Sequence, residues 1–292
     1  FAATSGRADG QSSLRASQPA ATTIDPKPAA TRSVRSFDVE WRLPFDEPIS
    51  TDRPDFTEST NLLPRGRFQL ESGYTFSYDR EGDERNRDHT FPEFLRRTGA
   101  AKHLELRIGW EGYSLTEDVF RAANDSGRTR TFHKHDDAGT DMSVGFKTHL
   151  LDQSGFVPGF SIIGALQLPS GASGNSSGIV DPEIKLLWGY ELTDRLGLAG
   201  NLNFAAPSDE QGRFFQPAAS VSLAYALTDW LGTYVEYFGF YPNERDTDCA
   251  HYLNSGFTFP ITENFQLDIR AGVGLNEDAD DLFTGIGFAF RF

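Results

Sequence analysis

The chain has 292 residues, a formal net charge of −15 and a single cysteine, and these values exclude several classes of protein. The acidic balance argues against a nucleic-acid partner. One cysteine, Cys249, can form neither an internal disulfide nor a cysteine-based zinc site. No apolar run approaches the roughly 18 residues of a membrane-spanning helix, but a transmembrane β-barrel needs only short alternating strands.

The first segment, residues 1–48, is rich in alanine, serine, threonine, proline and arginine, and it has no hydrophobic period. Such a composition buries too little apolar surface to form a core, so it predicts a flexible, disordered tail. Two roles fit it: a spacer through the cell envelope, or a leader with no further function.

The next segment, residues 49–66, is called the box here, and it contains the run Ser50-Thr-Asp-Arg-Pro-Asp-Phe-Thr-Glu-Ser59. Its charged residues are Asp52, Arg53, Asp55 and Glu58, followed by Arg65. The run is too polar for a strand that faces lipid.

Residues 67–292 show the two-residue alternation of strands with one apolar face. In the first strand, for example, Leu70 and Phe76 fall on one face and Glu71 on the other. We expect twelve strands, at residues 68–78, 91–98, 103–112, 140–149, 159–168, 182–190, 196–205, 216–227, 231–240, 250–259, 265–274 and 282–292. The predicted fold class is all-β: a 12-stranded antiparallel transmembrane β-barrel behind a disordered tail.

The last strand carries the strongest signal, because the chain ends with large apolar residues at alternate positions and on an aromatic terminus. Gly287, Phe288, Phe290 and Phe292 have the pattern of the assembly signal of bacterial outer-membrane barrels. In lipid such a face needs no cover, and closing the barrel satisfies the backbone. We therefore expect the barrel-assembly machinery as a partner during biogenesis.

Connections alternate in length, with short turns that begin near residues 99, 192, 227 and 261. Long polar loops lie between them, at about 79–90, 113–138, 169–181, 206–214, 241–249 and 275–281. This is the pattern of barrels in the Gram-negative outer membrane, with periplasmic turns and extracellular loops. An even strand count puts both termini on the periplasmic side.

The box, followed by Gly66-Arg-Phe-Gln-Leu-Glu71, resembles the outer-membrane transporters grouped as the MetA-pathway of phenol degradation family. Weaker matches follow, at Pro92-Glu93 with Arg97, Leu104–Arg107, Gly145–Lys147, Leu168–Gly171 and Gln266–Arg270. The resemblance covers roughly residues 49–292. It implies an aromatic or other small hydrophobic cargo.

Charged residues of both signs are expected to face the lumen, because each would be costly in lipid. They are Glu71, Glu93, Arg97, Glu105, Arg107, Asp141, Lys147, Glu183, Lys185, Glu236, Asp268 and Arg270. They can form a selective pore, or a salt-bridged interior that stabilises the barrel.

The box also has two interpretations. It either tucks into the lumen as a plug or gate, with Arg53 and Asp55 pairing with Arg97, Glu105 or Arg107, or it caps the first strand at the periplasmic rim.

Catalysis and cofactors find little support. His133 and His135, two residues apart in an expected loop, are weak candidates for a metal site, and a solvated loop is the better interpretation. No Gly-x-Ser-x-Gly motif or outward Ser–His pair appears, so we expect no enzyme and no cofactor.

The leading functional hypothesis is a porin-like channel for passive passage of small solutes, hydrophobic or aromatic ones included. The alternative is a non-conducting structural or assembly component of the envelope, which docks a protein partner through its tail or outer loops.

Overall fold

A computed structural model describes residues 49–123, 129–172, 175–209, 212–243 and 248–292, and the predicted tail lies outside them. None of the described residues belongs to a helix that could cross a membrane. The strands that form the closed ring are β1 (Phe68–Asp79), β2 (Arg85–Ala101), β3 (Leu104–Trp110), β6 (Met142–Leu151), β7 (Gly159–Leu168), β8 (Asp181–Glu191), β9 (Leu196–Ala205), β12 (Gln216–Thr228), β13 (Leu231–Phe240), β14 (Ala250–Thr262), β15 (Phe265–Gly274) and β16 (Leu282–Arg291).

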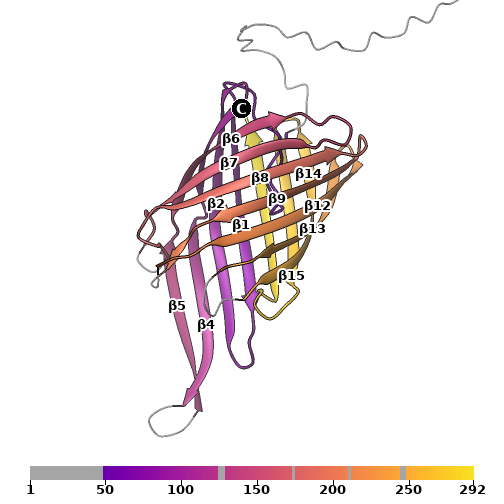
Figure 1. The fold of residues 1–292 in the computed structure, drawn as a ribbon. Coiled ribbons are helices and arrows are strands. Elements are labelled where there is room, and N and C mark those ends of the chain that lie inside the picture. Colours follow the sequence, from indigo (N-terminus) through magenta and orange to yellow (C-terminus); the bar gives the residue numbers. More distant parts are fainter. Residues whose placement is uncertain (1–48, 124–128, 173–174, 210–211, 244–247) are drawn as a thin grey trace, which may run out of the picture. The chain divides into compact units, whose positions relative to one another are not determined.

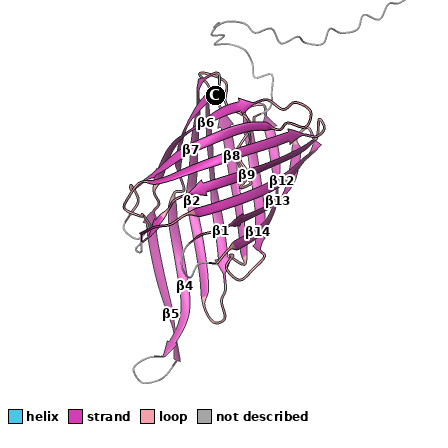
Figure 2. Cartoon of the chain, viewed as in Figure 1, coloured by secondary structure: helices cyan, strands magenta, loops and turns pink. Residues whose placement is uncertain are grey.

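Each strand of the ring pairs antiparallel with its two neighbours (Figures 1 and 2). The ring closes because β1 pairs with β2 on one side and with β16 on the other. At this seam Phe68 and Phe292 exchange two backbone hydrogen bonds of 2.9 Å. The predicted 12-stranded antiparallel barrel is confirmed.

Alternation along the strands separates an outer face from a lumen. On β16, Phe288 and Phe290 are exposed, whereas Phe283 and Ala289 are buried. The buried polar and charged residues of other strands, such as Glu71, share the inner side of this pattern. An apolar outer face requires lipid around it, since no other element of the described chain covers it.

The two ends of the barrel differ. Residues 102–103, 192–195, 229–230 and 263–264 connect strands at the end where Phe68 and Phe292 meet, which we call the short-turn end. The opposite, long-loop end carries residues 169–180, 206–215, 241–249 and 275–281. Among the described residues of these connections, the strands are β10 (Ser208–Asp209) and β11 (Gly212–Arg213), which pair with each other.

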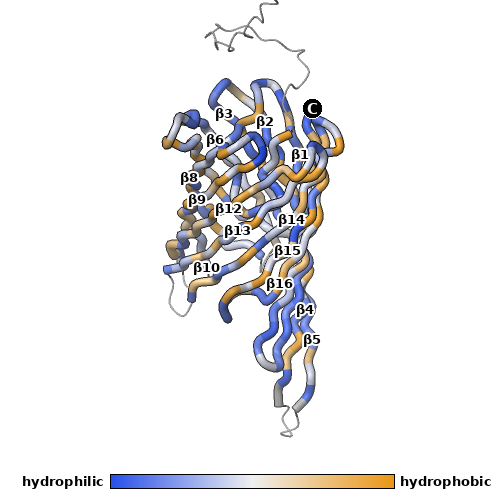
Figure 3. The backbone as a smooth tube through the Cα atoms, turned by 90° about the vertical axis from the view of Figure 1, so that its right-hand side faces the viewer, coloured by the Kyte–Doolittle hydropathy of each residue, from blue (hydrophilic) through white to orange (hydrophobic). Residues whose placement is uncertain are grey.

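Two expected loops are wrong. Much of 79–90 belongs to β2, and 113–138 contains β4 (Tyr113–Ala123) and β5 (Thr129–Gly139), a hairpin that continues past the ring (Figure 1). β4 pairs with residues 85–91 of β2, and β5 pairs with β4 alone. The hairpin is mainly hydrophilic (Figure 3), so the alternation that reveals a lipid-facing strand is weak there.

Gly112 separates β3 from β4 and has a φ of 95°, a conformation that favours glycine. A side chain there would also meet the backbone of Phe91 and Pro92. At this point the partner of β2 changes from β4 to β3.

Candidate functional site

The box lies inside the barrel, where its backbone is held by side chains of several strands. The carbonyl of Ser50 accepts hydrogen bonds from Gln69 at 2.8 Å and from Arg97 at 3.1 Å. Across the lumen, the carbonyl of Thr60 accepts one from Ser161 on β7 at 2.7 Å. These contacts satisfy backbone groups that would otherwise be unpaired in the interior.

Asp52 is the centre of the largest charge cluster. Its carboxylate lies 2.6 Å from Arg107 and 3.2 Å from Lys147, and 3.5 Å from Arg97. Its backbone N–H donates to the Glu71 carboxylate at 3.0 Å. Because a carboxylate removed from water needs paired cations, this cluster fixes the start of the box against β1, β2, β3 and β6.

Arg53 has different partners, on β2 and β15. Its guanidinium pairs with Glu93 and, at 3.5 Å, with Asp268. The expected partners of Arg53 and Asp55 are therefore wrong: Asp52, the neighbour of Arg53, pairs with Arg97 and Arg107. Asp55 has no ion pair within the described part of the chain.

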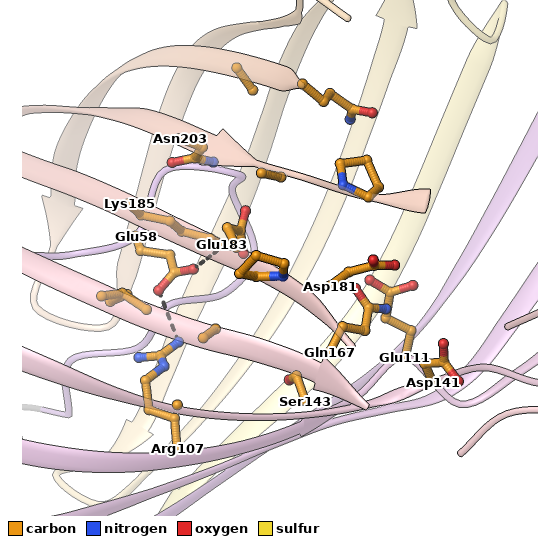
Figure 4. A pocket seen from close by; sticks show the side chains of 18 of the residues that line it. Glu58, Arg107, Glu111, Asp141, Ser143, Gln167, Asp181, Glu183, Lys185 and Asn203 are labelled. Atoms are coloured by element: carbon orange, nitrogen blue, oxygen red, sulfur yellow. Dashed lines mark hydrogen bonds and ion pairs between the residues drawn. The ribbon is translucent and has the colours of Figure 1, made fainter. Parts of the chain in front are cut away.

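Glu58 bridges two cations farther along the box. One carboxylate oxygen lies 2.9 Å from Arg107 and the other 2.7 Å from Lys185 (Figure 4). Glu236 on β13 holds the middle of the box differently, by accepting the backbone N–H of Phe56 at 2.9 Å and of Thr57 at 2.7 Å. Charged residues of the wall thus bind the box at several places, among them Asp52, Arg53, the backbone of residues 56–57, and Glu58.

Aromatic side chains inside the lumen were not predicted. Phe56 of the box stacks on Phe238, with ring centroids 4.8 Å apart. Phe238 also stacks on Tyr252 at 4.8 Å, and Phe283 meets the edge of Tyr252 at 6.0 Å. The inward direction of Glu236 could have revealed Phe238, two residues along the same strand and on the same face.

Two adjoining chambers remain in the lumen. The first has a volume of about 470 Å³, and its lining includes Glu58, Arg107 and four carboxylates: Glu111, Asp141, Asp181 and Glu183 (Figure 4). The second, of about 400 Å³, is lined by box residues and by Glu93 and Arg270. Leu95, Trp110, Glu111 and Ser143 line both chambers, so the two chambers adjoin.

The remaining candidates have mainly structural contacts. Glu105 pairs with Arg97 at 2.9 Å, and Arg270 donates to the carbonyl of Pro54 at 2.9 Å. Asp141 accepts the backbone N–H groups of Ser170 and Gly171, so it holds the start of a long loop.

His133 and His135 lie on strand β5 and not in a loop. His133 contacts Glu117 of β4 at 3.3 Å. Within the described residues, no group of three or more His, Cys, Asp or Glu side chains is arranged to hold a metal ion.

Comparison with known proteins gives a family and a fold. The sequence model of the family described as MetA-pathway of phenol degradation matches residues 51–292. An outer membrane channel from Pseudomonas putida F1 is similar, with a TM-score of 0.58 and 12% identity over 82% of this chain and 99% of that chain. The NanC porin has a TM-score of 0.45 and 9% identity, over 77% of this chain and 100% of that chain. No curated protein matches the sequence.

Proposed function

The chain belongs to the MetA-pathway of phenol degradation family, and from this premise we propose that it is an outer-membrane channel through which small solutes pass down a gradient. The termini of the barrel face the periplasm, and the long loops face the outside. The fold, the lipid-type outer face and the charged lumen support this assignment. No energy source is needed for such passage.

The box acts as the gate of the channel. The observation that carries this step is the set of ion pairs by which Asp52, Arg53 and Glu58 join opposite walls of the lumen. In the arrangement described, the box occupies the path between the chambers and the short-turn end. Passage of a solute requires the box to move, since it crosses the lumen.

The chambers favour a particular class of solute. Carboxylates outnumber unpaired cations in the first chamber, because Arg107 and Lys185 are both bound to Glu58. A ring of carboxylates favours cations. Phe56 and Phe240 also line the chamber and give an aromatic ring an apolar surface. Small cationic or aromatic solutes fit this lining.

The alternative is a barrel closed permanently by its box, with a structural or assembly role in the envelope. The burial of Asp52 among Arg97, Arg107 and Lys147 favours it, because such a cluster is costly to separate. The absence of an enzymatic activity stays a prediction in both cases.

Single-channel conductance in a planar bilayer separates the two functions. We would compare the full chain, a variant without residues 1–60, and a matched control without residues 1–48. The proposal expects larger or more frequent open steps only when residues 1–60 are deleted. Equal conductance of all three variants contradicts a gate. If none of the three variants conducts, although resistance to unfolding in SDS shows that each is folded, the result supports the structural role.

A further inference from the structure

The β4–β5 extension and the adjoining end of β2 carry three arginines on one face. Strand register puts Arg87, Glu117 and His135 side by side, and Arg85, Val119 and His133 in the next row. Directly paired residues of antiparallel strands project to the same side. We call this side the arginine face. Its basic members are Arg85, Arg87, His89, Arg121, His133 and His135, and it also carries the carboxylates Glu117 and Asp137.

The arginine face continues the lipid-facing surface of the barrel. Leu115 and Tyr113 lie on it, two and four register pairs from Glu117, and both are exposed. Tyr113 meets the edge of Trp110 at a ring-centroid distance of 5.3 Å. On β2, Phe91 pairs with Tyr113. A row of exposed aromatic residues is typical of the boundary between the hydrocarbon core and the lipid headgroups. The basic residues of the arginine face, which lie beyond this row, are therefore at the level of the headgroups.

The opposite face of the same sheet has a mixed charge. It carries Asp88, Asp118 and Asp136 together with Arg130 and Lys134, and these alternate with members of the arginine face. Asp88 accepts hydrogen bonds from Ser114 at 2.5 Å and Thr116 at 2.7 Å, toward the lumen side. In a chain with a net charge of −15, a face on which three arginines outnumber two carboxylates is a local exception.

The arginine side chains keep donors for a ligand. Side-chain exposure is 44% for Arg87 and 55% for Arg121. Arg87 pairs with Glu117 through one nitrogen, at 3.1 Å, and a guanidinium has five N–H donors. Hydrogen bonds from His133 and Arg87 lower the pKa of Glu117, so this carboxylate stays charged and orients Arg87.

We propose that the arginine face binds the phosphate groups of anionic lipid headgroups in the leaflet at the long-loop end, an inference that rests on the membrane location proposed above. Guanidinium groups match phosphate oxygens in pairs. The aromatic row below them lies at the depth of the attached acyl chains. Such a contact anchors the hairpin to the membrane surface and fixes its direction beyond the ring.

The test measures thermal unfolding of the full chain in neutral detergent with bisphosphorylated lipid A added. A double variant, Arg85→Gln with Arg87→Gln, removes two charges from the arginine face. The matched control, Arg130→Gln with Lys134→Gln, removes two charges from the other face of the same hairpin. We expect lipid A to raise the Tm of the parent and the control by several degrees, and the arginine-face variant to lose at least half of this shift.

Two further ligands test whether the lipid-bound phosphate groups are what the arginine face recognises. Dephosphorylated lipid A and inorganic phosphate alone should each give less than half of the shift. Equal shifts for both double variants, or a full shift with dephosphorylated lipid A, would overturn the proposal, as would a full shift with inorganic phosphate. Conductance of the arginine-face variant should match the parent, so the outcome is independent of whether the box gates the lumen.

Discussion

The guanidinium of Arg53 lies directly against Gly287 of β16, at the seam where the barrel closes. Gly73 of β1 pairs with Gly287 and contacts the same guanidinium. A Cβ atom built on either glycine meets only atoms of Arg53 as its three nearest neighbours. Because neither glycine has a side chain, the guanidinium of Arg53 has room to reach Glu93 and Asp268.

Gly73→Ala should displace the Arg53 guanidinium and weaken its charged hydrogen bonds, lowering the free energy of unfolding by about 1–3 kcal/mol. Urea titration of the protein in lipid vesicles measures the change. Gly197→Ala is the control, because its Cβ has only one neighbour within 4 Å, at 3.7 Å. In an Arg53→Ala background the loss of stability caused by Gly73→Ala should largely disappear. If the changes in the free energy of unfolding of the two substitutions are strictly additive in the double variant, the explanation is wrong.

Arg97→Ala should be far more damaging than a surface substitution. Arg97 is 1% exposed and pairs with Asp52, Glu71 and Glu105, so its loss leaves buried carboxylates without a partner. We expect a loss of roughly 3–5 kcal/mol in the same titration. Arg87→Ala, which breaks an exposed pair, should cost less than about 1 kcal/mol. Similar costs for the two would show that the cluster does not hold the box.

Selectivity tests the carboxylates of the chambers. Glu111 lines both chambers, so Glu111→Gln should lower the cation-to-anion permeability ratio, measured from the reversal potential in a salt gradient. Glu117→Gln removes the same charge from the outer hairpin and should leave the ratio unchanged. A ratio that stays constant in both variants would place the selective carboxylates elsewhere.

Alternation in the sequence was sufficient to predict the ring, because a wall between lipid and a polar lumen forces a period of two on each strand. It was least informative for β2, β7 and β13, where apolar residues occupy both faces. The lumen aromatic residues Phe238 and Phe240 belong to such a strand. The exact partners of Asp52 and Arg53 could not be predicted either, since they depend on the path of an irregular segment with no period.

Deleting the β4–β5 hairpin should leave the barrel intact. β3 and β6 pair from Leu104↔Thr148 to Trp110↔Met142 without it, so residues 113–139 can be replaced by a short Gly-Asn turn. We expect the shortened protein to refold, with a shift between heated and unheated samples on SDS gels like that of the parent. A variant that fails to refold would mean that the hairpin organises the seam between β2 and β3.

Phe56→Ala should release the box without removing a charge. Phe56 stacks on Phe238 at 4.8 Å and meets the edge of Phe240 at 5.4 Å, and aromatic pairs of this kind contribute about 0.5–1.5 kcal/mol each beyond their buried area. If the box gates the lumen, a loss of roughly 1.4 kcal/mol or more raises the ratio of open to closed time at least about tenfold. Single-channel recording measures that ratio directly. Phe120→Ala, which removes a stack with Phe132 at 5.6 Å in the hairpin, should leave it unchanged. An unchanged ratio in both variants, with Phe56→Ala still less stable than the parent, would mean that the box is a fixed part of the wall.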